Sequence, residues 1–134
     1  MRTSVFMLRL IRIIAEELQK VKGVEFAFLF GSYSRGKVHK FSDIDIGVYL
    51  SKEIPLRELL KHIPISDIPV DLKILNDSSP LFRLRVLKEG QLLFVKNERI
   101  LKDFIYDTLV KALEYKEIYE RLIKRFSKRV LYGL

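Results

Sequence analysis

The sequence predicts an α/β (α+β) fold, in which helices pack on a small β-sheet. Two segments, 43–50 and 70–75, alternate apolar and polar residues, a pattern typical of strands with one buried face. A third segment, VEFAFLF from Val24 to Phe30, is short and almost wholly apolar, as expected of a buried strand that ends at Gly31. Helical patterns precede, separate and follow these segments, so we expect strands and helices to share one core.

The first helix is predicted over residues 5–21 and should end near Gly23. One polar stripe at helical spacing consists of Arg9, Arg12, Glu16 and Gln19 or Lys20. Since most of the remaining positions are apolar, we expect this helix to be mostly buried. Its apolar run is interrupted by two arginines and carries no cleavage site of the secretory kind. We therefore interpret it as neither a signal peptide nor a membrane span, and expect a cytoplasmic protein.

Proline and glycine mark the ends of the shorter elements. Pro55 begins a short helix over residues 55–63, which closes before the next proline. Ser79 and Pro80 begin another helix, which runs to about residue 88 and stops at Gly90. Residues 92–95 form the last strand that the pattern predicts.

A long C-terminal helix is predicted from Glu98 to about Lys128, because no glycine or proline interrupts this stretch and its apolar residues recur at steps of four and three. Such a helix would be roughly 45 Å long, against a domain diameter of about 36 Å, so part of it should overhang or bend. Its end carries the apolar residues Ile118, Tyr119, Leu122, Ile123, Phe126, Val130 and Leu131. Two alternatives follow: this end docks a partner protein, or it folds back on its own domain.

Length and composition are those of one compact domain. The chain has 134 residues, of which 49% are hydrophobic, and no cysteine, so neither a disulfide framework nor a thiolate metal site is expected. We expect a single domain over residues 1–134, with a catalytic core over about 1–96 and a helical extension over about 98–132. The formal net charge of +8 would attract a polyanionic ligand such as a nucleoside triphosphate. No nucleic-acid-binding motif accompanies this charge, so nucleic acid is not expected as a direct substrate.

Two aspartates lie on one face of the strand predicted over residues 43–50. Asp43 and Asp45 alternate with the apolar residues, so their Cα atoms should be about 6.6 Å apart on the same side. Two like charges this close repel each other, and a divalent cation with a preference for oxygen ligands would remove the conflict. A solvated strand face that merely carries two acids is the alternative.

A turn that could hold phosphate precedes this strand. Gly31 ends the apolar strand and Ser32 begins a short turn or helix, where free N–H groups and a glycine allow phosphate oxygens to approach the main chain. Ten residues separate Ser32 from Asp43. A Gly-Ser pair alone is weak evidence, and this spacing is what makes it informative.

The combination of Gly31-Ser32, ten intervening residues and Asp43-x-Asp45 resembles the signature of the DNA polymerase beta-like nucleotidyltransferase superfamily. In so short a chain, the surrounding segment GSYSRGKVHKFSDIDIGVYL resembles the minimal nucleotidyltransferase (MNT) branch. This resemblance implies a palm-like fold with a small mixed sheet and helices packed on one face. It also implies a third carboxylate on a later strand, and Asp71 stands in the right order. The alternative for Asp71 is an exposed strand residue paired with Lys73.

The resemblance further implies the role of each site residue. Asp43, Asp45 and Asp71 would be catalytic and would bind two Mg²⁺ ions, with ATP as the substrate. The residues expected to bind the nucleotide are Gly31, Ser32, Arg35 and Lys37. For either basic residue, a solvated surface position is an equal alternative.

The MNT branch consists largely of antitoxins paired with HEPN-domain ribonuclease toxins. By this resemblance, the chain is expected to transfer AMP from ATP to a tyrosine hydroxyl of such a toxin, with which it would form a hetero-oligomer. The alternative is a nucleotide-binding or non-catalytic module that neutralises the toxin by contact. An adaptor that binds RNA through the basic C-terminal end is the weakest possibility.

Overall fold

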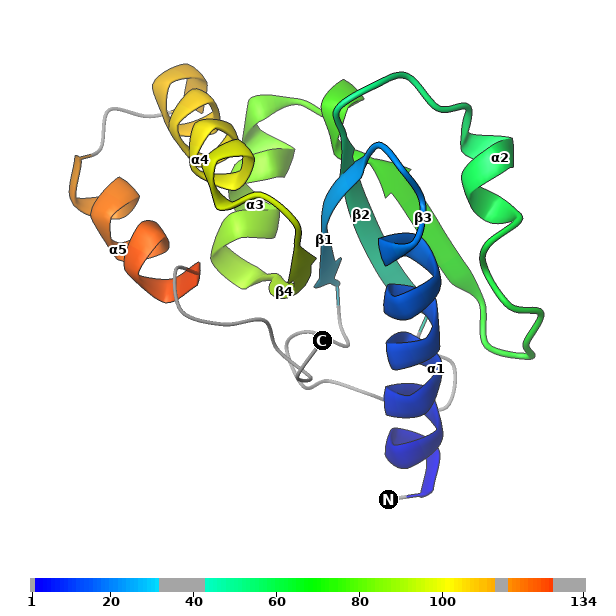
Figure 1. Cartoon of the computed structure of the whole chain (residues 1–134). Helices are drawn as coiled ribbons and strands as arrows, with labels where there is room; N and C mark the ends of the chain where they lie inside the picture. Colours follow the sequence, from blue (N-terminus) through cyan, green and yellow to red (C-terminus); the bar gives the residue numbers. More distant parts are fainter. Residues whose placement is uncertain (1, 32–42, 113–115, 127–134) are drawn as a thin grey trace.

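A computed structural model of the chain describes residues 2–31, 43–112 and 116–126 (Figure 1). In this part of the chain, one mixed sheet has the strand order β3-β2-β1-β4. The central strand β1 (Val24–Phe30) is antiparallel to both β2 (Ile44–Leu50) and β4 (Gln91–Val95). The edge strand β3 (Val70–Ile74) runs parallel to β2. The α/β class and the mixed sheet are therefore confirmed, and each predicted strand is present within a residue or two of its expected bounds.

One face of the sheet is covered by α1 (Arg2–Gln19) and by the short helix α2 (Leu56–Leu60), which lies in the crossover between the parallel strands. Ala27 and Leu29 of β1 point into this cluster, together with Ile44 and Ile46 of β2. The short helix begins directly after Pro55, as the sequence predicts.

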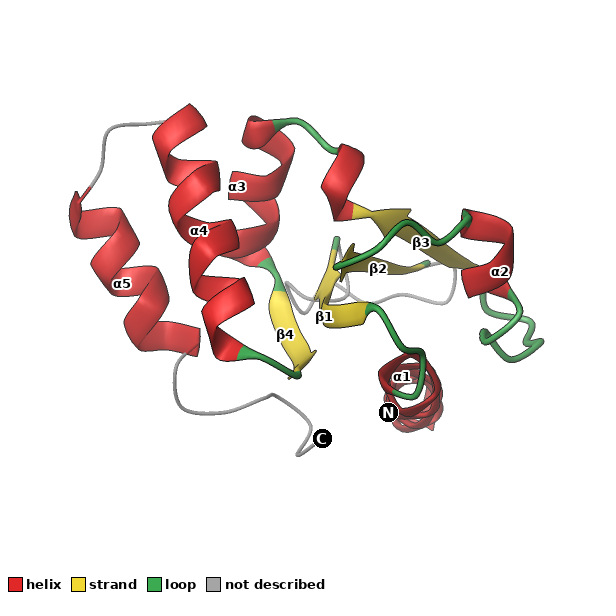
Figure 2. Cartoon of the chain, turned by 45° about the horizontal axis from the view of Figure 1, so that its top comes forward, coloured by secondary structure: helices red, strands yellow, loops and turns green. Residues whose placement is uncertain are grey.

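The other face is covered by α3 (Pro80–Glu89), α4 (Glu98–Ala112) and α5 (Lys116–Phe126) (Figure 2). Phe26 and Phe28 of β1 point into this second cluster. The expectation that helices pack on one face was therefore wrong. The physical reason lies in β1 itself: both of its faces are apolar, and each must be covered.

The first helix is less buried than expected. Its inner face is fully buried, but Val5, Phe6, Leu8 and Ile13 are between 39% and 55% exposed. Figure 1 shows the N-terminal turns of α1 extending beyond the strands, where the sheet offers nothing to pack against. Among the described residues, no helix combines the length and the apolar character needed to cross a membrane.

The single long C-terminal helix was also a wrong prediction, because the structure has two helices. The first ends at Ala112, the second begins at Lys116, and they lie side by side (Figure 1). Leu122 and Phe126 of α5 are buried, and the Phe126 ring meets the Phe28 ring edge-on at 5.3 Å between centroids. Folding back buries this apolar stripe, which contributes more than a few helical hydrogen bonds would. The fold-back alternative thus holds for residues 116–126, whereas Val130 and Leu131 lie outside the described residues.

Arg125 of α5 forms hydrogen bonds to the C-terminal end of α3. Its guanidinium donates hydrogen bonds to the carbonyl oxygens of Lys88 at 2.9 Å and Gly90 at 2.8 Å. The last carbonyls of a helix have no partner within the helix, and a cation supplies one while also meeting the negative end of the helix dipole. At the other end of α3, Ser79 is the N-cap residue, and its hydroxyl accepts a hydrogen bond from the Phe82 amide, as the sequence predicts.

Arg125→Gln should therefore lower the free energy of unfolding by about 1–2 kcal/mol, because the carbonyl oxygens at the end of α3 lose a charged donor. Urea unfolding at neutral pH measures this. Arg121→Gln is the matched control, since Arg121 is exposed on the same helix and forms no ion pair in the described part of the chain; its effect should stay within about 0.5 kcal/mol. Equal effects of the two substitutions would contradict the role given to Arg125.

Candidate active site

The parallel pairing of β2 and β3 brings two of the three proposed carboxylates side by side. In the register of the two strands, Asp45 is the partner of Asp71. Directly paired residues of neighbouring strands point to the same face of a sheet, so these two side chains share one face. Asp43 is exposed and immediately precedes β2. It lies close enough to Asp45 to act on its charge, so the structure gathers the three acids that the sequence indicated.

Carboxylates of like charge lie close together in this site. Partial burial raises the pKa of Asp45, and the neighbouring carboxylates of Asp71 and Asp43 raise it further; among the described residues, the Lys73 ammonium acts in the opposite direction. Burial and like charges both disfavour the ionised form of a carboxyl group. Negative charge is thus concentrated here beyond what the neighbouring residues in the described part of the chain neutralise.

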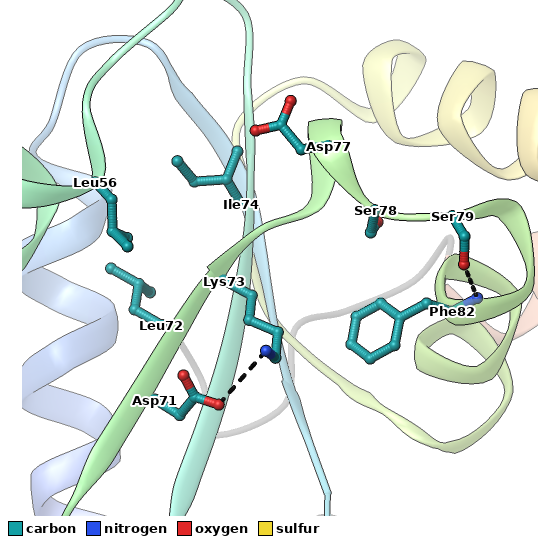
Figure 3. A pocket seen from close by; sticks show the side chains of 9 residues that line it. All are labelled: Leu56, Asp71, Leu72, Lys73, Ile74, Asp77, Ser78, Ser79 and Phe82. Atoms are coloured by element: carbon teal, nitrogen blue, oxygen red, sulfur yellow. Dashed lines mark hydrogen bonds and ion pairs between the residues drawn. The ribbon is translucent and has the colours of Figure 1, made fainter.

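Asp71 has one basic neighbour. The Lys73 Nζ lies 3.7 Å from the Asp71 Oδ2, and about half of each side chain is exposed (Figure 3). An ion pair with this exposure contributes little to stability. The pairing proposed as an alternative for Asp71 is therefore present, but it coexists with the close approach to Asp45.

Gly31 makes room for the Asp45 carboxylate. Its φ angle is +81°, a conformation that side chains rarely adopt, and a Cβ placed on it would collide with the Asp45 Oδ2. Glycine is therefore required here for two independent reasons. The other residues expected to bind nucleotide, Ser32, Arg35 and Lys37, lie outside the described residues.

Other described elements cover the part of β2 that follows Asp45 on the acidic face of the sheet. On the same face of β2, the ring of Tyr49 packs against Phe26 and Phe104, and Gly47 is covered by Leu75, whose Cδ2 would lie 2.9 Å from an added Cβ. At the beginning of the strand, Asp45 is half-buried and Asp43 is exposed. Within the described residues, the acidic positions therefore remain accessible.

The carboxylates suit a hard divalent cation, although they do not enclose one. Within residues 2–31, 43–112 and 116–126, no three His, Cys, Asp or Glu side chains are arranged to hold a metal ion. Mg²⁺ is commonly bound by one or two carboxylates together with substrate phosphates, rather than by a cage of protein ligands. Oxygen donors with excess negative charge meet that requirement, and phosphates would supply the remaining ligands.

Two hollows flank the carboxylates, and Phe82 of α3 lines both. The larger, of about 600 Å³, contains Asp71 and Lys73, while the smaller, of about 200 Å³, contains Gly31, Asp45 and Arg85. The Phe82 ring is held edge-on against Phe30 at 5.4 Å between centroids. Phe82 and Arg85 were not predicted as site residues, because no local pattern indicates how α3 packs against the sheet.

The comparison with protein families identifies the chain. The family model described as "Polymerase beta, Nucleotidyltransferase" matches residues 12–99, which is more than half of the sequence. The chain belongs to this nucleotidyltransferase family. The matched region contains β1 to β4 and all three carboxylates.

Solved structures share the fold of this nucleotidyltransferase. A toxin–antitoxin structure with AMP-PNP is 24% identical, with a TM-score of 0.56 over 89% of this chain and 88% of that one. A complex of the tri-AMPylated HEPN toxin of Shewanella oneidensis with its MNT antitoxin is 21% identical, with a TM-score of 0.56 over 88% of this chain and 91% of that one. At these identities the likeness shows the fold alone. A comparison with curated proteins gives no match.

Gly31→Ala should destabilise the nucleotidyltransferase by about 1–3 kcal/mol, because the new methyl group meets both an unfavourable φ and the Asp45 carboxylate. Urea unfolding of the single and double variants separates the two causes. In an Asp45→Ala background only the cost of the backbone conformation remains, so the same substitution should be less destabilising. An equal cost in both backgrounds would show that the glycine is not needed to accommodate Asp45.

The pKa of Asp45 predicts how stability depends on pH. Because this pKa is raised in the folded state, the folded protein binds the proton more tightly than the unfolded chain does. The free energy of unfolding should therefore fall as pH rises from the ordinary carboxyl value through the raised value. Asp45→Asn removes the charge, so without divalent cations the variant should melt at a higher temperature than the wild type at pH 7, and the difference should shrink in acid.

Thermal unfolding in EDTA at several pH values measures this difference. Asp103→Asn is the control, because Asp103 is an exposed aspartate on α4, away from the site and paired with Arg99. If Asp45→Asn lowered the melting temperature at neutral pH, the assigned repulsion would be wrong.

Proposed function

We propose that this nucleotidyltransferase is a Mg²⁺-dependent protein adenylyltransferase, which transfers AMP from ATP to a tyrosine hydroxyl of a HEPN-domain toxin. The observation that carries the proposal is the pairing of Asp45 with Asp71, beside Asp43 and the side-chain-free backbone of Gly31. A catalytic site for phosphoryl-type transfer needs clustered carboxylates next to a position where phosphate can approach the main chain.

The carboxylates would hold the metal ions. Asp43 and Asp45 would bind both, and Asp71 would bind the ion nearer the acceptor. Bound Mg²⁺ supplies charge stabilisation for the attacking and leaving oxygens of an in-line displacement. The mutual repulsion of the three acids favours cation binding, because a cation relieves the conflict that raises the pKa of Asp45.

The remaining residues would position the substrates. Gly31, Ser32, Arg35 and Lys37 would bind the phosphates of ATP, the last two by neutralising charge on the leaving pyrophosphate. Asp71 would accept the proton of the attacking hydroxyl, since it lies on the accessible edge of the site and is half exposed. The acceptor oxygen would bond to the α-phosphorus as the bond to the bridging oxygen breaks.

The nature of the partner is supported by the structural neighbours. They include an MNT antitoxin in complex with a tri-AMPylated HEPN toxin and a toxin–antitoxin with AMP-PNP. A hetero-oligomer with a HEPN-domain protein is proposed here on that ground. The alternative is a module that binds nucleotide or masks the toxin without turnover, and the three clustered carboxylates argue against it because simple contact does not require them.

The test is transfer of label from α-³²P-ATP to a HEPN-domain partner in the presence of Mg²⁺. Asp45→Asn and Asp71→Asn should each lower the rate about a hundredfold or more, because each removes several kcal/mol of charge stabilisation or positioning. The control Asp103→Asn should transfer label at the wild-type rate. Neutralisation of the toxin by a wild-type protein that transfers no label would favour masking instead.

A further inference from the structure

The larger hollow lies along the free edge of the sheet. Four consecutive residues of β3, 71–74, line it, together with Leu56 at the start of α2 and Phe82 on α3 (Figure 3). Successive strand residues point to opposite faces, so a cavity that contacts all four must extend along the edge of the strand rather than over one face. The hollow is thus a groove beside β3 that begins at Asp71.

The edge of β3 has unused hydrogen-bonding capacity. This strand pairs with β2 on one side. On its other side, residues 70–74 form no backbone hydrogen bond with any described segment. Exposed strand edges accept an additional strand from another chain, and main-chain hydrogen bonds then supply affinity while side-chain pockets supply selectivity.

The lining of the groove suits an aromatic side chain with a polar tip. Leu56, Ile74 and Phe82 supply apolar walls, and the Asp71 carboxylate lies at one end. At the other end lies Asp77, whose carboxylate forms no hydrogen bond or ion pair with the described residues. A ring fits between apolar walls while its hydroxyl group reaches a carboxylate, and a cationic neighbour in the bound segment would pair with Asp77.

The two hollows are arranged for two substrates. The smaller contains Gly31 and Asp45, next to the proposed phosphate position, and the larger contains Asp71. Phe82 lies between them, held by Phe30. In-line displacement requires the attacking and leaving groups on opposite sides of the phosphorus, which a divided site of this kind provides.

We infer that the groove beside β3 binds the acceptor segment of the partner protein, in extended conformation along the strand edge, with its acceptor tyrosine directed at Asp71. This inference rests on the proposed function, for which it names the acceptor subsite. The phenol oxygen forms a bond to the α-phosphorus and its proton passes to Asp71. The bond between the α-phosphorus and the bridging oxygen breaks, and its electron pair leaves with pyrophosphate.

A matched pair of variants tests the subsite. Leu56 and Leu60 both lie on α2 and are 42% and 43% exposed, but only Leu56 lines the groove. With a HEPN-domain protein as the acceptor, Leu56→Arg should raise the KM for that protein at least about tenfold, because a guanidinium replaces an apolar wall, and leave the KM for ATP within about twofold. Leu60→Arg should change neither constant.

Hydrogen exchange gives a readout that does not need turnover. Addition of the HEPN-domain protein without ATP should slow exchange of the amides at 71–74 in the wild type and in Leu60→Arg, but much less in Leu56→Arg. The inference is overturned if these amides gain no protection, if the two arginine variants have the same KM for the acceptor, or if Leu56→Arg alters the KM for ATP instead. If the wild type protects these amides and transfers no label, the groove stands as a docking site and the proposed adenylyl transfer fails.

Discussion

The parallel pairing of β2 with β3 is the constraint on which the site depends. Asp45 faces Asp71 only in the observed register, since a slip of one residue would turn Asp71 toward the apolar cluster under α1 and expose Leu72. A side chain reinforces this register. The Asn76 amide, in the 3₁₀ turn Leu75–Asp77 after β3, accepts a hydrogen bond from the Leu50 N–H and donates one to the Leu50 carbonyl, both at 2.8 Å. The ends of the two strands are thereby joined as if the pairing continued.

The raised pKa of Asp45 predicts that the carboxylate cluster reduces the stability of the unliganded fold at neutral pH. Burial and two like charges raise the pKa of Asp45, and the half-exposed Lys73 offsets only part of this. Sites that bind cations or substrates commonly conflict with local stability, because the interactions that favour the ligand are incomplete without it. Gly31 shows the same conflict between stability and ligand binding, since its left-handed conformation brings the main chain against the Asp45 carboxylate. The repulsion among the acids and the absence of a side chain at Gly31 both suit the proposed ligands, a cation and the phosphates of a nucleotide.

The two faces of the sheet have different structural roles. The cluster beneath α1 and α2 supports β2 and β3 from behind, with Ile44, Ile46 and Leu72 buried in it. On the opposite face, α3, α4 and α5 cover the aromatic residues of β1 and the far end of β2, and their coverage ends before Asp45. Arg83 connects these elements, since its guanidinium donates to the carbonyl oxygens of Leu75 and Asn76 and lies 3.5 Å from the Asp107 carboxylate. Arg83 thus connects α3, whose Phe82 lines both hollows beside the carboxylates, to the turn after β3 and to α4.

The strands, the caps of α3 and the acidic pair Asp43 and Asp45 could be predicted from the sequence, because these depend on alternation, on proline and glycine, and on spacing within one segment. Asp71 could be proposed from its order along the chain, but its place beside Asp45 required the register of two strands. The turn back of α5, the helices on the second face, and the approach of Phe82 and Arg85 followed only from the tertiary structure. Each depends on which apolar surfaces are available to bury, and an uninterrupted helical pattern from residue 98 onward does not contain that information. Short-range preferences decide where an element begins and ends, whereas burial against Phe26 and Phe28 decides where it lies.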